Sequence, residues 1–281
     1  MKIALLATTT LTAMLAVTGC AITGTAPGGP LHAGTTTQIQ PSLALAYGPG
    51  SATVGGTRVS GNAESYGGTK AELLPVPMRL GLRQSLGSAV EVSGDVGWLD
   101  SGAEVRAGTP GGTGAFPIAF AAGVRQGPFP FGVGERTFSG HARFEIYPDI
   151  SNAHDGSVRL TLSAGVGVGS FAHSLTLPDS YRSTGGDVPN FDPFGAIVVR
   201  PETRLELGLG IHRFGPRGGV GATLLPWIVL ASGAPTRMTC SACLFASGAN
   251  QAVSDYSQSW GMSLAITPTV WGDIIGHLLG G

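Results

Sequence analysis

The sequence predicts an all-β protein: a closed antiparallel up-and-down transmembrane β-barrel of about ten strands, with a range of 8–12, and a short C-terminal amphipathic helix. Three observations predict this fold. Apolar and polar residues alternate strictly in several segments, as they do in strands whose two faces meet different surroundings. Charged residues are few and glycines are many. All long connections also fall on one side of the predicted barrel.

The N-terminus predicts secretion. Lys2 precedes an apolar stretch, residues 3–17, which ends in small residues. This pattern is typical of a signal peptide, here residues 1–19, and the stretch is too short to cross a membrane as a helix.

The end of this signal peptide resembles the lipobox of bacterial lipoproteins, in the run Val17-Thr18-Gly19-Cys20. The resemblance implies that Cys20 becomes the lipidated first residue. Because Ala21-Ile22 follow in place of an acidic residue, it also implies delivery to the outer membrane by the lipoprotein-sorting machinery. An ordinary signal peptide that happens to carry a cysteine is the alternative.

The composition argues against nucleic acid as a partner, because 16 Lys and Arg stand against 17 Asp and Glu. Charged residues make up 12% of the chain, where globular proteins average about 25%, and 46 of the 281 residues are glycine. Without an apolar run of helix length beyond the signal peptide, this composition favours a surface that meets lipid through strands. A glycine-rich β-sandwich has a similar composition.

The rest of the chain divides into three parts. Residues 20–34 predict a lipidated tether, because Gly, Pro, Thr and Ala occur there without periodicity. Residues 35–268 form the predicted barrel, and residues 269–281 a C-terminal tail. We expect ten strands, at residues 35–48, 74–85, 89–99, 103–108, 115–126, 136–148, 156–170, 194–214, 218–230 and 256–268.

The second and third of these segments predict a hairpin with one apolar and one charged face. A loop at residues 86–88 would set Arg83 opposite Glu91 and Arg79 opposite Asp95. Segments 136–148, 156–170 and 194–214 repeat the two-faced pattern over about ten residues, which is enough to cross a bilayer in a tilted strand. Aromatic residues near strand ends suggest an interfacial girdle: Tyr47, Trp98, Phe116, Tyr147, Phe171 and Phe214.

The connections predict an orientation. With a periplasmic N-terminus, the three long connections, 49–73, 171–193 and 231–255, fall on the outer side together with 100–102 and 127–135. The inner side receives only short connections, 86–88, 109–114, 149–155 and 215–217. This asymmetry is typical of outer-membrane barrels. It requires residues 194–214 to be one strand despite Pro201, and it places both termini in the periplasm.

The last predicted strand resembles the β-signal of outer-membrane proteins, from Ser259 to Ile266. The resemblance implies recognition by the barrel-assembly machinery. Behind it, Trp271, Ile274, Ile275, Leu278 and Leu279 have the spacing of one face of a short amphipathic helix. A frayed terminus is the alternative.

The polar faces predict a lumen in which seven cations and five anions nearly cancel. Its cations are Arg79, Arg83, Arg106, Arg125, Arg143, Arg159 and Arg204, and its anions are Glu91, Asp95, Glu104, Glu145 and Glu206. Such balance favours a narrow or plugged lumen over a selective pore. Small inward residues, such as Ala119, Ala121 and Gly123, instead predict open space.

We expect no catalytic residues, no metal-binding residues and no cofactor. His154-Asp155, His173-Ser174, and His141 with Glu145 occur without a local catalytic motif, so we interpret them as polar turn and lumen residues. Cys240 and Cys243 predict a disulfide that pins a loop in an oxidising compartment.

The expected role is therefore structural or surface-binding, with outer-membrane lipid as one partner and an external ligand at the long loops as another. Three alternatives remain open. They are a soluble lipoprotein with a β-sandwich or lipocalin-like barrel, a narrow channel, and a lipid-modifying outer-membrane enzyme.

Overall fold

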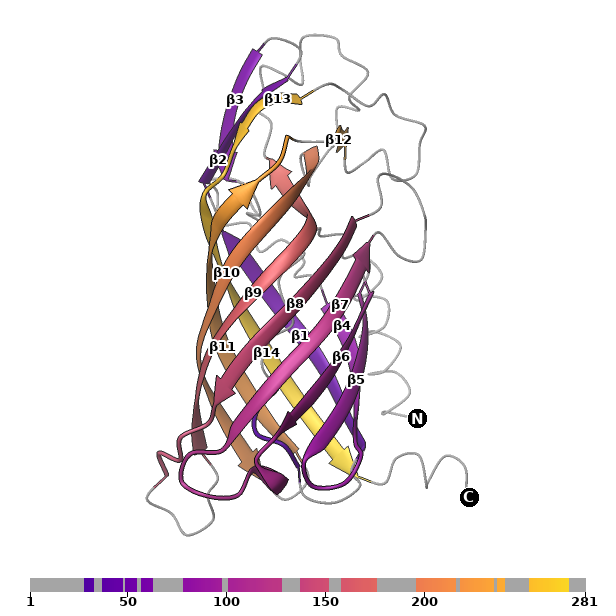
Figure 1. The fold of residues 1–281 in the computed structure, drawn as a ribbon, viewed down its shortest axis with the longest axis vertical. Coiled ribbons are helices and arrows are strands. Elements are labelled where there is room, and N and C mark those ends of the chain that lie inside the picture. Colours follow the sequence, from indigo (N-terminus) through magenta and orange to yellow (C-terminus); the bar gives the residue numbers. More distant parts are fainter. Residues whose placement is uncertain are drawn as a thin grey trace, which may run out of the picture.

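The computed structural model describes residues 28–32, 37–47, 49–54, 57–62, 78–97, 101–127, 137–151, 158–175, 196–215, 218–234, 237–240 and 253–272. Ten of its strands surround a common interior (Figure 1). They are β1 (Thr37–Tyr47), β4 (Met78–Ser85), β5 (Val90–Gly97), β6 (Ser101–Gly108), β7 (Ile118–Gly127), β8 (Thr137–Ile146), β9 (Val158–Leu175), β10 (Ala196–Gly215), β11 (Gly218–Ser232) and β14 (Trp260–Gly272).

These strands pair in chain order, each antiparallel to the next, from β1 through β4 to β11 and on to β14. Strand β14 also pairs with β1, so each of the ten has two neighbours in the ring. We call this ring the barrel and its interior the lumen. The prediction of an all-β antiparallel fold is confirmed, and residues 196–215 form one strand through Pro201.

The last strand differs from its predicted bounds. Strand β14 continues to Gly272, so residues 269–272 belong to the barrel wall and not to a tail. The alternation explains this extension, because Thr269 is buried in the lumen and Val270 is exposed on the outer face. The remaining residues of the predicted helix, 273–281, lie outside the described part of the chain.

Four short strands lie in the segments 49–73 and 231–255, which the sequence predicted as long connections, and the last of them continues to residue 257. β2 (Pro49–Val54), β3 (Thr57–Asn62) and β13 (Val253–Ser257) form a second sheet in the order β13-β2-β3. β12 (Arg237–Cys240) pairs with the start of β10. The small sheet stands beyond the long-loop end of the barrel (Figure 1), and the other end carries the short turns.

The barrel is polar inside and apolar outside. On β14, Ser263, Ala265 and Thr267 are buried, whereas Leu264 and Ile266 between them are exposed. The same alternation places arginine, glutamate and threonine side chains in the lumen around the ring and leaves apolar side chains on the outer face. No helix in the described residues is long and apolar enough to span a membrane.

The hairpin of β4 and β5 has a different register from the predicted one. Ser85 pairs with Glu91 and Arg83 with Ser93, so each β4 residue pairs with a residue two positions later than expected. The turn is longer than residues 86–88, and it is closed by a hydrogen bond of 2.8 Å from Leu86 N to Val90 O. A shift of two residues keeps every side chain on its face but changes its partner.

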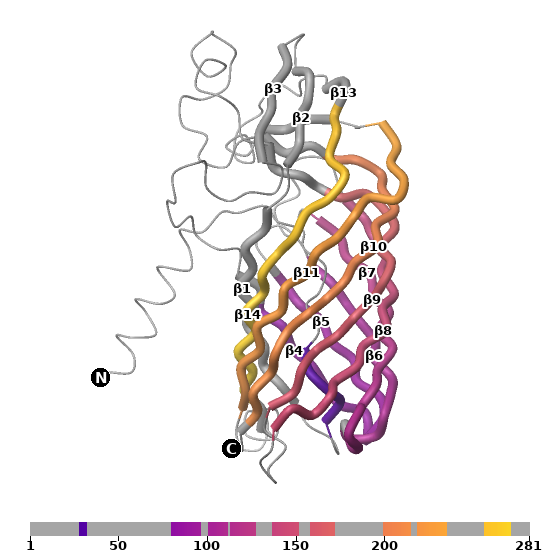
Figure 2. The backbone as a smooth tube through the Cα atoms, turned by 90° about the vertical axis from the view of Figure 1, so that its left-hand side faces the viewer, coloured from indigo at the N-terminus to yellow at the C-terminus, as the bar shows by residue number. Residues whose placement is uncertain are grey.

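Residues 28–32 also correct the sequence analysis, which placed them in a tether outside the barrel. This segment, the indigo stretch in Figure 2, lies within the lumen near the short-turn end. Leu31 is buried there in one apolar cluster with Ala119 and Tyr147. The segment shows no alternation of apolar and polar residues because it is not a strand. Side chains of the surrounding strands bind its backbone instead.

Candidate functional site: the ion-paired lumen

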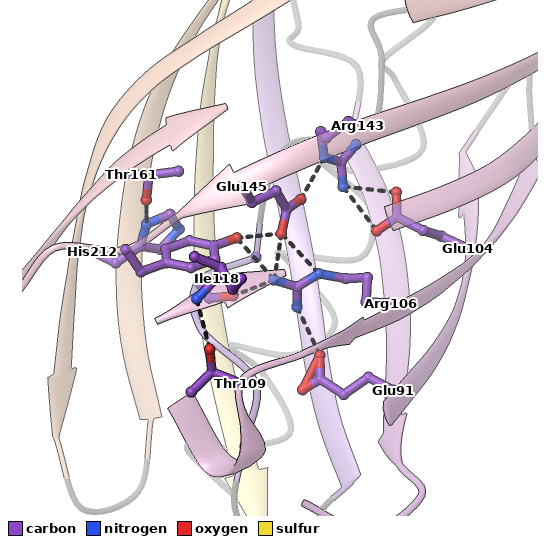
Figure 3. A network of polar contacts seen from close by, with 12 residues as sticks. Glu91, Glu104, Arg106, Thr109, Ile118, Arg143, Glu145, Thr161 and His212 are labelled. Carbon is purple, nitrogen blue, oxygen red and sulfur yellow. Dashed lines mark hydrogen bonds and ion pairs between the residues drawn. The ribbon is translucent and has the colours of Figure 1, made fainter. Parts of the chain in front are cut away.

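Arg106 is the centre of the charged contacts in the lumen (Figure 3). Its Nη1 lies 2.7 Å from Oε1 of Glu91, and its Nη2 lies 2.7 Å from Oε2 of Glu145. Nη2 also donates to the Tyr147 hydroxyl at 2.8 Å, and that hydroxyl donates to Glu145 at 2.6 Å. All four side chains are buried. One cation is thus surrounded by two carboxylates and a phenol, away from solvent.

Arg143 extends these contacts along the lumen. Its Nη2 donates to both carboxylate oxygens of Glu104, at 2.9 and 2.7 Å, and its Nε donates to Glu145 at 2.5 Å. Nε2 of His141 lies 2.8 Å from Oε2 of Glu104. Glu145 therefore joins Arg106 to Arg143. We call the set Glu91, Glu104, Arg106, His141, Arg143, Glu145 and Tyr147 the lumen network.

Small residues on β7 make room for the lumen network. In register, Ala121 stands between Arg106 on β6 and Arg143 on β8, and Ala119 pairs with Glu145. Because alanine ends at Cβ, the Arg106 side chain can cross β7 and reach Glu145. The open space that the sequence predicted at these positions is therefore filled by long side chains from the neighbouring strands.

Asp95 and Arg125 form a second ion pair, which also reaches across an intervening strand at a small residue. Arg125 donates from Nη2 to Oδ1 of Asp95 at 2.5 Å and from Nη1 to Oδ2 at 3.1 Å. The two residues lie on β5 and β7, with Gly102 of β6 between them. A Cβ added at Gly102 would lie 2.8 Å from Nη1 and 3.1 Å from Oδ2. The pair closes across β6 only because that position has no side chain.

Replacing Gly102 by valine is therefore expected to separate Asp95 from Arg125 and to lower the free energy of unfolding by about 1–3 kcal/mol, as overpacking does. Gly94 provides the control, because its side-chain position meets only the Gly102 carbonyl at 3.7 Å. Urea unfolding of both variants in detergent measures the difference. Equal stability of Gly102→Val and Gly94→Val would contradict this role of Gly102.

A third cluster lies farther toward the long-loop end, where Glu202 joins two arginines of β10. Its Oε1 accepts from Nε of Arg200 at 2.8 Å, and its Oε2 accepts from Nε of Arg204 at 2.7 Å. The Arg204 guanidinium lies between two rings, 3.9 Å from the Phe171 centroid and 4.1 Å from that of Trp227. Two cation–π contacts on a desolvated arginine hold β9, β10 and β11 together.

Arg200 connects this cluster to the chain that enters β14. Its guanidinium lies 4.8 Å from the Tyr256 ring centroid and donates to the carbonyl oxygens of Tyr256 and Gln258, at 3.3 and 2.9 Å. The sequence analysis missed Arg200 and Glu202. The sequence did contain a signal for them, because residues 200, 202 and 204 are spaced by two and therefore share one face of the strand.

Three aromatic residues predicted for an outer girdle face the lumen instead. Tyr147 and Phe171 are buried, and Phe214 stacks on His212 with 6.0 Å between ring centroids. Position parity explains the correction, since Tyr147 follows Arg143 and Glu145 at intervals of two along one face. Phe116 is 70% exposed at a turn. The side chains of Tyr47 and Trp98 lie outside the described part.

The structure brings Arg83 and Glu91 together in the lumen, although not as direct cross-strand partners. Nε of Arg83 lies 3.8 Å from Oε1 of Glu91, a diagonal contact that the long arginine side chain can reach. The Arg79 side chain lies outside the described part, so its predicted contact with Asp95 stays a prediction, and Asp95 contacts Arg125.

Arg159 lies at the short-turn rim and not in the lumen network. Its Nη2 is 3.6 Å from Oδ2 of Asp149, and its Nη1 donates to the Tyr147 carbonyl at 3.2 Å. Hydrogen bonds from the Ser151 side chain and backbone lower the pKa of Asp149, which keeps its carboxylate charged opposite Arg159. Glu206 is half-buried and lies beside Gly167 on β9.

Several predicted residues fall outside the described side chains. Cys20, Cys243, His154 and Asp155 lie in segments that the structure does not describe. Cys240 ends β12, and the backbones of His173 and Ser174 belong to β9. The described residues contain no group of three His, Cys, Asp or Glu side chains positioned to hold a metal ion.

No family model and no curated protein matches this chain. Among solved structures, the outer membrane protease OmpT from Escherichia coli is similar at a TM-score of 0.41 and 9% identity, over 84% of this chain and 95% of that one. The neisserial surface protein A (NspA) is similar at a TM-score of 0.28 and 9% identity, over 83% of this chain and 96% of that one.

Proposed function

We propose that this protein is a lipid-anchored outer-membrane β-barrel with a structural or surface-binding role and a closed, ion-paired lumen. The observation that carries the proposal is the inverted distribution of polarity around the barrel. Leucine, valine and phenylalanine side chains are exposed on the outer face, whereas arginine and glutamate side chains are buried inside. Lipid around the barrel accounts for both faces.

Water around the barrel would make the apolar outer face costly, and a soluble fold would have no reason to bury charges inside. Each half-exposed Leu or Val would forgo roughly 1 kcal/mol of transfer free energy. Each ion in the lumen network carries a desolvation cost of several kcal/mol, which a soluble fold avoids by placing charges at its surface. This energy balance favours the membrane barrel over the soluble lipoprotein with its apolar face inward.

The lipid anchor at Cys20 is consistent with the position of the N-terminal segment. Gly28 lies in the lumen near the short-turn end, and the seven residues 21–27 separate it from Cys20. An extended chain from Cys20 to Gly28 spans at most about 28 Å. We therefore place the anchor in the inner leaflet of the outer membrane, with the short turns in the periplasm.

This orientation directs the long connections and the small β13-β2-β3 sheet outward, where an external ligand would bind. The ladder between β1 and β14 is continued by β2 and β13, in which Ser51 pairs with Ser257. The barrel wall thus supports this sheet directly. The proposed role is binding and support of the envelope rather than catalysis, because the titratable side chains of the lumen network are engaged with one another.

Heat-modifiable migration tests the membrane barrel. The unboiled protein, extracted in detergent, is expected to migrate faster on a denaturing gel than the boiled protein, because a membrane barrel stays folded in detergent until heated. Cys20→Ser provides the matched control, since it removes the anchor but leaves the barrel. Identical migration before and after boiling, with release of Cys20→Ser into buffer, would favour the soluble lipoprotein.

A further inference from the structure

The segment Gly28–His32 is bound in the lumen like a short peptide ligand. Nη1 of Arg83 donates to the Gly28 carbonyl at 3.1 Å, and Nη2 of Arg106 donates to the Gly29 carbonyl at 2.5 Å. The His32 N–H donates to Oε2 of Glu91 at 3.2 Å. Charged side chains from β4, β5 and β6 thus bind the backbone of this segment, and charge-assisted bonds are the stronger kind.

The site accepts glycine at two consecutive positions and excludes larger residues. A Cβ on Gly28 would lie 1.9 Å from Nη1 of Arg83, the group that binds its carbonyl. Gly29 has a φ of 87°, and a Cβ there would lie 2.7 Å from Cζ of Phe214. Backbone conformation and the ring together make glycine necessary at the second position.

The other end of the segment supplies an apolar contact. Leu31 is 3% exposed and packs with Ala119 and Tyr147, two residues that also border the lumen network. Burial lowers the pKa of the His32 imidazole, so this side chain is neutral at pH 7. The segment therefore binds through its backbone and one apolar side chain, and it adds no charge to the balanced lumen.

The lumen wall carries hydroxyl groups in addition to the charged side chains that contact the segment. Oγ1 of Thr223 and Oγ of Ser85 are buried, and the described residues give neither a hydrogen-bond partner. Buried Thr267 and Thr269 carry further hydroxyl groups on β14, near the same end of the barrel. Without the segment, hydroxyl and charged groups would surround the vacated volume, and such a volume hydrates.

We propose that Gly28–His32 is an internal plug, held by a lumen site that selects the backbone of a Gly-Gly-x-Leu sequence and closes the short-turn end of the barrel to ions. This inference rests on the proposed membrane barrel. The plug and the anchor at Cys20 belong to one continuous stretch of chain, so a pull on that stretch from the periplasmic side would act directly on the plug.

Conductance of the purified full-length protein in planar bilayers, with potassium chloride as the probe, tests the plug. Gly29→Val is expected to raise the fraction of open time on the order of tenfold over the natural protein, because it strains the backbone and clashes with Phe214. Gly114→Val is the matched control. Gly114 has a φ of 94° but no atom near its side-chain position, and its turn lies outside the lumen.

A cysteine pair tests docking independently of conductance, in a background with Cys240→Ser and Cys243→Ser. Leu31→Cys with Ala119→Cys is expected to form a disulfide, whereas Leu31→Cys with Ile118→Cys is not, because Ile118 is on the outer face of the same strand. Adding Gly29→Val is expected to reduce the yield of the first pair. Equal yields from the two pairs would overturn the docked position.

The plug is overturned if Gly29→Val undocks the segment but leaves conductance at the natural level, or if the natural protein is already as open as the variant. Heat-modifiable migration of every variant confirms that the barrel has folded. Loss of that property in the natural protein would overturn the membrane barrel itself. Disulfide formation between residues 31 and 119 would then still report whether the segment is docked, so the two failures are distinguishable.

Discussion

Replacing Arg106 by methionine is expected to lower the free energy of unfolding by about 3–5 kcal/mol, the usual effect of removing one partner of a buried ion pair. The substitution keeps an unbranched apolar side chain but removes the guanidinium that contacts Glu91, Glu145 and Tyr147. Urea unfolding in detergent, followed by tryptophan fluorescence, measures the change. The loss arises because two carboxylates remain in the lumen with fewer donors than they need.

Arg213 provides the matched control for this variant, because it is exposed at the end of β10. Arg213→Met is expected to change stability by less than about 0.5 kcal/mol. Neutralising Glu91 in the Arg106→Met background should restore part of the loss, since it removes a buried charge that has lost the nearer of its two arginines. Equal effects of Arg106→Met and Arg213→Met would show that the lumen network adds nothing to stability.

Replacing Leu207 by arginine is expected to destabilise the barrel by about 2–4 kcal/mol in a bilayer, the effect of arginine near the midplane on a lipid-facing strand. Leu207 is 46% exposed on the outer face, near the middle of β10. The same substitution on a water-facing surface would change stability by less than about 0.5 kcal/mol. Unfolding of the protein in lipid vesicles therefore distinguishes the two surroundings.

Leu86 is the matched control, because it is 59% exposed but belongs to the turn between β4 and β5. Leu86→Arg is expected to leave stability nearly unchanged in vesicles, since the proposed membrane barrel places this turn outside the hydrocarbon layer. A small effect at both positions would contradict the lipid-facing assignment. Large effects at both would point to packing rather than to lipid.

The strands were predictable because their signal is local. Alternation over eight to twenty residues defines a strand and divides its residues between two faces, and both properties repeat at every second position. This reasoning located all ten strands of the barrel, including the long β10 with Pro201 inside it. It also correctly assigned Arg143 and Glu145 to the opposite face of β8 from the neighbouring apolar residues.

The partners of the charged residues were not predictable in the same way. Asp95 was predicted opposite Arg79 from an assumed turn, whereas its cross-strand partner is Gly81 and its side chain also reaches Arg125 two strands away. That contact depends on Gly102 of the intervening strand, just as the contact between Arg106 and Glu145 depends on the alanines of β7. Which side chain crosses which strand is decided by the small residues in register between them.

The register of the first hairpin depended on its surroundings as well. The carbonyl of Ala89 accepts from Gly108 N at 3.0 Å, and the carbonyl of Ser88 accepts from Gly111 N. These bonds tie the turn between β4 and β5 to the end of β6 and the turn that follows it. Sequence reasoning treated the hairpin alone, so it selected a loop two residues too short.

The sequence by itself determined that this protein is built of antiparallel strands with one polar and one apolar face. These properties depend on residue order along single strands. Only the tertiary structure decided which arginine meets which glutamate, and that Gly28–His32 lies in the lumen. Those features depend on contacts between residues far apart in the chain, such as Arg106 and Gly29, and no local pattern encodes them.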